Sequence, residues 1–142
     1  MLSFDVNWLA VLVAAVVAFV LGGFWYSDAL FGKQWRKGGG ISDAEVKKEK
    51  KKGLNFMLPN MFGGFLRRFV TGFFLVNFLA WVGATGVSEA LQFTFWLWLG
   101  FFAMQMLGSI FWDGKKFDYY LINVIYVLVM FMTMAAIVSS WV

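Results

Sequence analysis

Few side chains in this sequence can do chemistry, because the 142 residues include neither cysteine nor histidine. Disulfides, thiol nucleophiles, thiolate metal sites and imidazole acid–base chemistry are therefore excluded, and with them most redox and metalloenzyme mechanisms. We expect no metal ion and no cofactor. What remains is a set of polar but uncharged side chains embedded in long apolar stretches: Tyr26, Ser27, Asn77, Gln105, Ser109, Asn123, Tyr126 and Thr133.

Some of these polar residues recur at helical intervals. Asn123, Tyr126 and Thr133 are three and seven residues apart, and Gln105 and Ser109 are four apart, so each set shares one face of a helix. One interpretation is the polar lining of a path for a solute or an ion. The other, which we favour, is hydrogen bonding between neighbouring helices, since amides and hydroxyls commonly join spans in lipid.

The carboxylates offer little for catalysis. Asp28 and Asp113 fall on the same predicted side of the chain, but no spacing in the sequence brings them together. Helix capping and pairing with nearby lysines is the simpler interpretation. No apolar stretch carries an ionisable residue at its centre, where proton relays and ion-coupled transporters usually need one. We therefore predict a protein that is not an enzyme.

Long uncharged stretches must position these side chains. Hydrophobic residues make up 61% of the chain and charged residues 14%, whereas an ordinary soluble domain is about 25% charged. About 20 apolar residues suffice for a helix to cross a bilayer, and four stretches are that long. The sequence predicts one all-α domain over residues 1–142, a membrane bundle of four transmembrane helices at about 6–30, 65–87, 90–112 and 119–141.

The first stretch carries a ladder of small residues, each four positions from the next: Ala10, Ala14, Ala18 and Gly22. Small residues at this spacing allow another helix to approach closely in lipid, where packing drives association. We expect this ladder to join the chain to a second copy of itself or to a larger membrane complex.

The main polar loop spans about 32–64. Ser42 and Glu45 form a capping-box pattern that predicts a short helix from Asp43 to about Lys52. The apolar segment 54–60 is too short to span, so we expect it to lie along the membrane surface. Starting the second span near residue 65 then lets two arginines and the lysines of the short helix reach anionic headgroups: Lys47, Lys48, Lys50, Lys51, Lys52, Arg67 and Arg68.

The basic residues also predict orientation. All twelve lysines and arginines lie either between residues 33 and 68 or at 115–116, which are loops on one side of the membrane. The positive-inside rule makes that side cytoplasmic and places both termini outside. The lysine cluster has two interpretations, that it only sets this topology and that it also binds lipid, and we weigh them evenly. The net charge of +4 follows from this asymmetry, so we expect no nucleic-acid partner.

Several motifs resemble a known family. The opening Asn7-Trp8-Leu9-Ala10, the later Trp25-Tyr26-Ser27 and the segments Leu30-Phe31-Gly32-Lys33 and Leu121-Ile122-Asn123 resemble the bacterial family called domain of unknown function 1761. The resemblance covers nearly the whole chain. It implies a small four-span protein of the bacterial cytoplasmic membrane, and it supplies no activity, substrate or catalytic residue.

Three functions fit this reading of the sequence. The first is a non-enzymatic accessory or structural subunit that assembles through the ladder. The second is a homo-oligomeric pore or small-solute permease lined by polar residues of the third and fourth spans. The third is a lipid-binding protein that uses the two arginines and the lysine helix at the headgroups.

Overall fold

The computed structural model describes residues 3–141, and every regular element within that range is helical. Four of the described segments are long and apolar enough to cross a membrane, which confirms the predicted all-α class with four candidate spans. The elements are α1 (Trp8–Trp25), α2 (Gly32–Gly39), α3 (Asp43–Lys51), α4 (Leu54–Trp81), α5 (Val87–Leu97), the π-helix η1 (Trp98–Ala103), α6 (Met104–Met106), α7 (Gly108–Phe111) and α8 (Phe117–Ser140).

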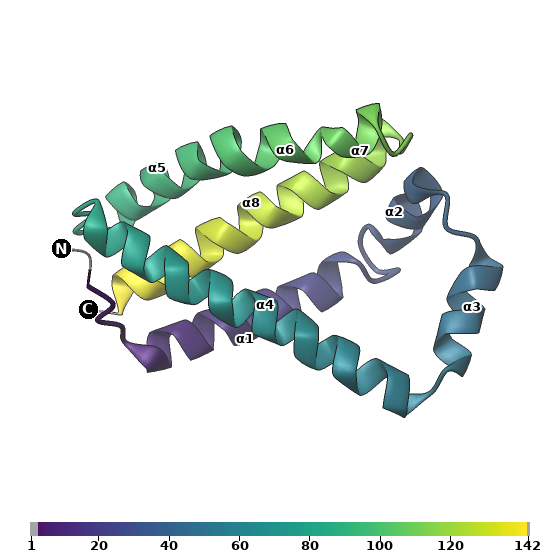
Figure 1. The fold of residues 1–142 in the computed structure, drawn as a ribbon, viewed down its shortest axis with the longest axis horizontal. Helices are drawn as coiled ribbons and strands as arrows, with labels where there is room; N and C mark the ends of the chain where they lie inside the picture. Colours follow the sequence, from purple (N-terminus) through teal and green to yellow (C-terminus); the bar gives the residue numbers. More distant parts are fainter. Residues whose placement is uncertain (1–2, 142) are drawn as a thin grey trace.

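Helix α8 lies at the centre of the arrangement. It packs against α1 and α4, against α5 and η1, and near its start against α2. Figure 1 shows α1 and α4 crossing each other, with the α5–α7 segment running beside α8. Both chain ends lie at one end of the molecule, and α2 and α3 lie at the other.

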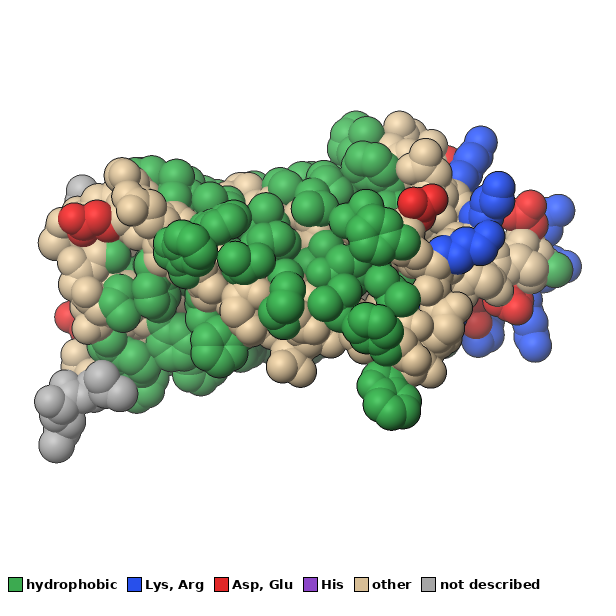
Figure 2. All heavy atoms as spheres, turned by 90° about the horizontal axis from the view of Figure 1, so that it is seen from above, with side chains coloured by type: hydrophobic (Ala, Val, Ile, Leu, Met, Phe, Trp, Pro, Cys, Tyr) green, Lys and Arg blue, Asp and Glu red, His purple; other side chains and the backbone are tan. Residues whose placement is uncertain are grey.

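We call the end formed by α2 and α3 the basic end. Figure 2 shows lysine and arginine side chains gathered there, next to a broad apolar belt. The clustering follows from the sequence, because the first loop holds most of the basic residues. The structure shows that these basic side chains share one end of the molecule.

Local caps explain where two helices begin. Asn7 Oδ1 accepts hydrogen bonds from the backbone nitrogens of Leu9 (3.1 Å) and Ala10 (3.2 Å), which fixes the start of α1. Ser42 Oγ accepts from the Glu45 nitrogen at 3.2 Å, as its capping pattern predicted. Helix α3 then runs to Lys51, close to its expected end.

Helix α4 corrects the expected second span. It begins at Leu54 and continues unbroken through Pro59, instead of starting near residue 65 after a separate surface segment. Pro59 lies in the second turn and removes one backbone donor, while the side-chain nitrogen of Asn60 bonds to the Phe56 carbonyl oxygen at 2.8 Å. With 28 residues the helix is about 42 Å long, which exceeds the roughly 30 Å hydrocarbon core of a bilayer.

The third span is also less regular than predicted. The expected single helix over 90–112 is divided into α5, the π-helical segment η1, and the short helices α6 and α7. The indole nitrogen of Trp98, the first residue of η1, donates to the Val124 carbonyl oxygen of α8 at 2.9 Å. This bond holds the irregular segment against the central helix.

Candidate lipid-binding site

The small-residue ladder lies inside the chain's own bundle. Ala10 is 1% exposed, Ala14 and Ala18 are 0% exposed, and Gly22 is buried, because α1 packs this face against α4 and α8. The ladder allows close helix packing, but it does so within one chain. It is not a free surface for a second copy or a larger complex, and the structure corrects that expectation.

The last residue of the ladder, Gly22, faces the side chain of Arg68. A Cβ added at Gly22 would lie 2.6 Å from Nη2 of Arg68 and 2.6 Å from the phenol oxygen of Tyr126. Arg68 donates to that phenol oxygen from Nε (3.0 Å) and Nη2 (2.8 Å), and from Nη1 to the Gly64 carbonyl oxygen (2.8 Å). Tyr126 in turn donates to the Ala18 carbonyl oxygen at 3.1 Å. Arg68 therefore points between the helices rather than outward to headgroups, while Arg67 is exposed.

A second polar cluster joins the first and fourth spans. Asn123 Oδ1 accepts a hydrogen bond from the phenol of Tyr26 at 2.7 Å and another from the indole nitrogen of Trp35 at 3.0 Å. The rings of Tyr26 and Trp35 also meet edge to face. Asn123 and Tyr126 thus bond between helices, which is the interpretation that their spacing favoured.

The remaining sequence candidates do not form one continuous path. Ser27 bonds locally to the Phe24 carbonyl oxygen at 2.6 Å, and Asn77 donates to the Phe73 carbonyl oxygen at 2.7 Å. Asn77 Oδ1 is buried without a hydrogen-bond partner within residues 3–141. Thr133 is half-buried further along α8.

Three sequence candidates do converge, in a cavity that we call the polar pocket. Gln105 and Ser109 line it from α6 and α7, and Asn123 lines it from α8. Its volume is about 460 Å³. The other residues of its wall include aromatic side chains and one carboxylate: Trp112, Asp113, Tyr119 and Tyr120.

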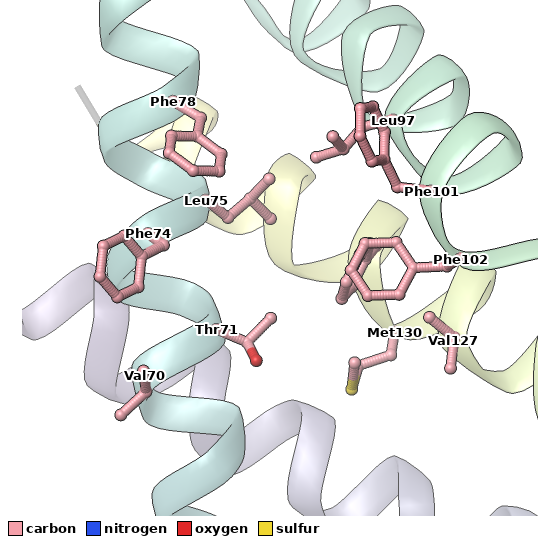
Figure 3. A pocket seen from close by; sticks show the side chains of 11 residues that line it. Val70, Thr71, Phe74, Leu75, Phe78, Leu97, Phe101, Phe102, Val127 and Met130 are labelled. Carbon is pink, nitrogen blue, oxygen red and sulfur yellow. The ribbon is translucent and has the colours of Figure 1, made fainter. Parts of the chain in front are cut away.

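A larger apolar cavity, which we call the groove, lies between α4 and the α5–η1 segment with α8 as its floor. Its volume is about 610 Å³, within the range of small-molecule sites. Figure 3 shows side chains from the three helices facing one another across it. The lining is Val70, Thr71, Phe74, Leu75, Phe78, Leu97, Phe101, Phe102, Val127, Met130 and Phe131.

Each wall of the groove becomes polar about one helical turn closer to the basic end. On α4, Arg67 precedes Val70 by three residues and so lies on the same stripe. On α8, Asn123 precedes Val127 by four residues. On the third span, Gln105 follows the last lining residue by three. The groove and the polar pocket therefore follow one seam between α8 and the third span, apolar along most of its length and polar toward the basic end.

The remaining charged groups lie outside this seam or at its rim. Asp28 pairs with Arg36 at 2.6 Å, and this hydrogen bond holds the pKa of the Asp28 carboxyl below its usual value. Asp113 lies at the polar pocket, so the two carboxylates line different parts of the molecule. Among residues 3–141, no group of three or more acidic, histidine or cysteine side chains could hold a metal ion. The lysines of α3 are exposed, and Lys52 pairs with Glu49 at 2.9 Å.

The groove was not foreseen from the sequence. Its aromatic and aliphatic residues look like ordinary span residues, and only the way α4 diverges from the third span leaves them open to one another. Arg67, by contrast, was a sequence candidate for contact with headgroups, and its position at the groove's end gives that hypothesis a geometric basis.

Comparison with known protein families identifies the family of this chain. The model of a family described as a protein of unknown function, DUF1761, matches residues 9–139, which is nearly the whole chain. No curated protein and no solved structure matches the chain.

Proposed function

Because this chain belongs to the DUF1761 family, whose description gives no activity, we infer its function from the geometry alone and propose that it is a non-enzymatic, multi-pass membrane protein that binds an anionic phospholipid. An acyl chain would lie in the groove, and the lipid phosphate would lie beside Arg67.

The observation that carries this proposal is the position of Arg67 at the polar end of an apolar groove. An exposed guanidinium presents several donors in a planar fork that suits phosphate oxygens. Arg67 makes no ion pair within residues 3–141. One turn along α4 begins an apolar lining open to the hydrocarbon phase. Charge at one end and apolar surface along the rest is the complement of an anionic lipid.

The basic end adds attraction of longer range. Helix α3 exposes four lysines and Lys52 directly after it a fifth, and a basic residue close to an anionic leaflet contributes about 1 kcal/mol. These lysines would raise the local concentration of anionic lipid, while Arg67 and the groove would select one molecule from it.

The accessory-subunit and pore hypotheses are supported less well. The ladder proposed for assembly is buried within the chain, so any assembly would need another surface. Of the residues proposed to line a pore, Tyr126 bonds between helices, and so does the Oδ1 atom of Asn123.

Native mass spectrometry of the protein in lipid discs of mixed anionic and zwitterionic composition tests the proposal. We expect the parent protein to retain anionic lipid and Arg67→Gln to lose most of it. Lys37→Gln is the matched control, because it removes the same charge from an exposed position on α2, away from the groove. Equal retention by both variants, or a stoichiometric protein partner with no lipid, would overturn the proposal.

We also propose that the protein lies in the bacterial cytoplasmic membrane with its basic end in the cytoplasm. The natural chain has no cysteine, so single cysteines report their own accessibility. A membrane-impermeant thiol reagent applied to intact cells should label Gly86→Cys, between α4 and α5, and spare Glu49→Cys on α3. The reverse pattern would show the opposite orientation.

A further inference from the structure

The polar pocket lies beside the groove, and some of the polar side chains that line it make no hydrogen bond to other residues of the chain. Within the described residues, the side chains of Gln105 and Ser109 make no hydrogen bond, although both line the pocket. Gln105 is exposed and Ser109 is half-buried, so both side chains are free to bond to water or to a ligand that enters the pocket.

Asn123 adds a donor whose direction is fixed. Its Oδ1 accepts from both Tyr26 and Trp35, and this pair of bonds sets the plane of the amide. The amide nitrogen takes part in neither bond, and Asn123 is part of the pocket wall. The two bonds therefore do more than join helices, because they also prevent the amide from rotating freely.

The composition of the pocket indicates which ligand chemistry would fit. Amides and hydroxyls both donate and accept, and the Asp113 carboxylate at the rim only accepts. Hydroxyl groups of a ligand also both donate and accept, so they match this set. A second phosphate does not match it, because Asp113 would repel the charge.

The apolar groove and the polar pocket follow one another along the same seam between α8 and the third span. Asn123 lies four residues from Val127 on α8, which is about 6 Å along the helix axis. A lipid whose chain occupies the groove and whose phosphate lies near Arg67 would therefore direct the groups beyond its phosphate toward the polar pocket.

We propose that the polar pocket is a headgroup subsite for a phospholipid whose phosphate carries a hydroxylated group, with phosphatidylglycerol as the representative ligand. The side chains of Gln105 and Ser109 form hydrogen bonds with the headgroup hydroxyls. This inference rests on the lipid-binding function proposed above and names the lipid class that the same seam selects.

Competition between two anionic lipids tests it. Discs would contain equal amounts of phosphatidylglycerol and phosphatidic acid, which has a phosphate but no hydroxylated headgroup, and native mass spectrometry would count each bound species. We expect the parent protein to prefer phosphatidylglycerol about three- to tenfold, the size of effect that one or two hydrogen bonds give.

Gln105 is exposed and Ser109 is half-buried, so both positions can be changed without disturbing the buried core. Gln105→Leu, alone or with Ser109→Ala, should bring the preference close to one. Gln92→Leu is the matched control, since Gln92 is an exposed glutamine of α5 outside the pocket, and it should keep the preference.

The outcomes separate the two proposals. If the parent protein retains no anionic lipid, the proposed function fails and this inference fails with it. If it retains anionic lipid without preference, or if the preference persists in Gln105→Leu with Ser109→Ala, only the headgroup subsite is overturned.

Discussion

Arg68 of α4 donates two hydrogen bonds, of 3.0 and 2.8 Å, to the phenol oxygen of Tyr126 on α8. Its guanidinium carbon also lies 5.7 Å from the centre of the Tyr126 ring and 5.7 Å from that of Phe19. No carboxylate pairs with Arg68 within residues 3–141. This cation is therefore held by the Tyr126 hydroxyl, the Gly64 carbonyl oxygen and two ring faces, while the neighbouring Arg67 remains exposed at the end of the groove.

Replacing Tyr126 by Phe should destabilise the fold. The change removes an acceptor of two charge-assisted bonds and a donor to Ala18, so we expect a loss of about 1–2 kcal/mol. Thermal unfolding in detergent, followed by circular dichroism, measures it. Tyr119→Phe is the control, because the Tyr119 ring stacks on Trp35 and its hydroxyl makes no hydrogen bond within residues 3–141. Equal melting temperatures for both variants would contradict the role given to the Tyr126 hydroxyl.

Replacing Gly22 or its neighbour Gly23, near the end of α1, by alanine should have opposite effects on the stability of the protein. A Cβ at Gly22 would meet Arg68 and Tyr126 at 2.6 Å, so Gly22→Ala should lower the melting temperature. A Cβ at Gly23 meets nothing within 4 Å, and alanine is favoured over glycine in helices by about 1 kcal/mol. Gly23→Ala should therefore leave the melting temperature unchanged or raise it. A larger loss from Gly23→Ala than from Gly22→Ala would show that α1 packs with a different face.

Ala14→Leu should weaken the fold of the single chain rather than its assembly. Ala14 is 0% exposed, and forcing added side-chain volume into a packed core costs about 1–3 kcal/mol. Val16→Leu, at a position 45% exposed, should have little effect. Melting temperature and native mass would be measured together. A change of assembly size without loss of stability in Ala14→Leu would restore the ladder as an interface between chains.

The titration of Asp28 should depend on Arg36. The hydrogen bond from Arg36 lowers the pKa of Asp28 below its ordinary value of 3.8, so the contact is present above that value and is lost as the pH falls through the lowered pKa. In Arg36→Gln the pKa should return toward 3.8, as measured by the carboxyl carbon chemical shift. Lys37→Gln should leave it nearly unchanged, and identical titrations in all three proteins would exclude the contact in solution.

The number of apolar helices was readable from the sequence because charge is absent from long stretches and concentrated between them. The capped helix α3 was equally clear, since Ser42 and Glu45 carry a local signal. The start of the second span was predicted wrongly, because both arginines were expected to reach the headgroups from its first turn. In the structure the Tyr126 hydroxyl holds Arg68 between the helices, and α4 begins at Leu54. Pro59 is tolerated there because it lies near the start of the helix, where a missing backbone donor costs little.

The candidate site was only partly predictable for a different reason. Helical spacing gathered Gln105 with Ser109, and Asn123 with Tyr126, into two sets of side chains. Which partners each set meets depends on how the helices are ordered around α8, and spacing along the chain contains no information about that order. Asn123 therefore reaches the polar pocket while Tyr126, three residues away, turns to Arg68.

The π-helical segment Trp98–Ala103 determines how the rest of the third span is rotated about its helix axis. A π-turn holds one residue more than an α-turn, and one residue of α-helix corresponds to a rotation of about 100°. If this segment recoiled into α geometry, everything beyond it would turn by about that angle about the helix axis. Gln105 and Ser109 would then leave the seam, while Leu97, which precedes the segment and lines the groove, stayed in place. The alignment of the polar and apolar halves of the seam is thus set by the coiling of six residues, the last of which, Ala103, accepts a hydrogen bond from the Tyr120 hydroxyl in the pocket wall at 2.8 Å.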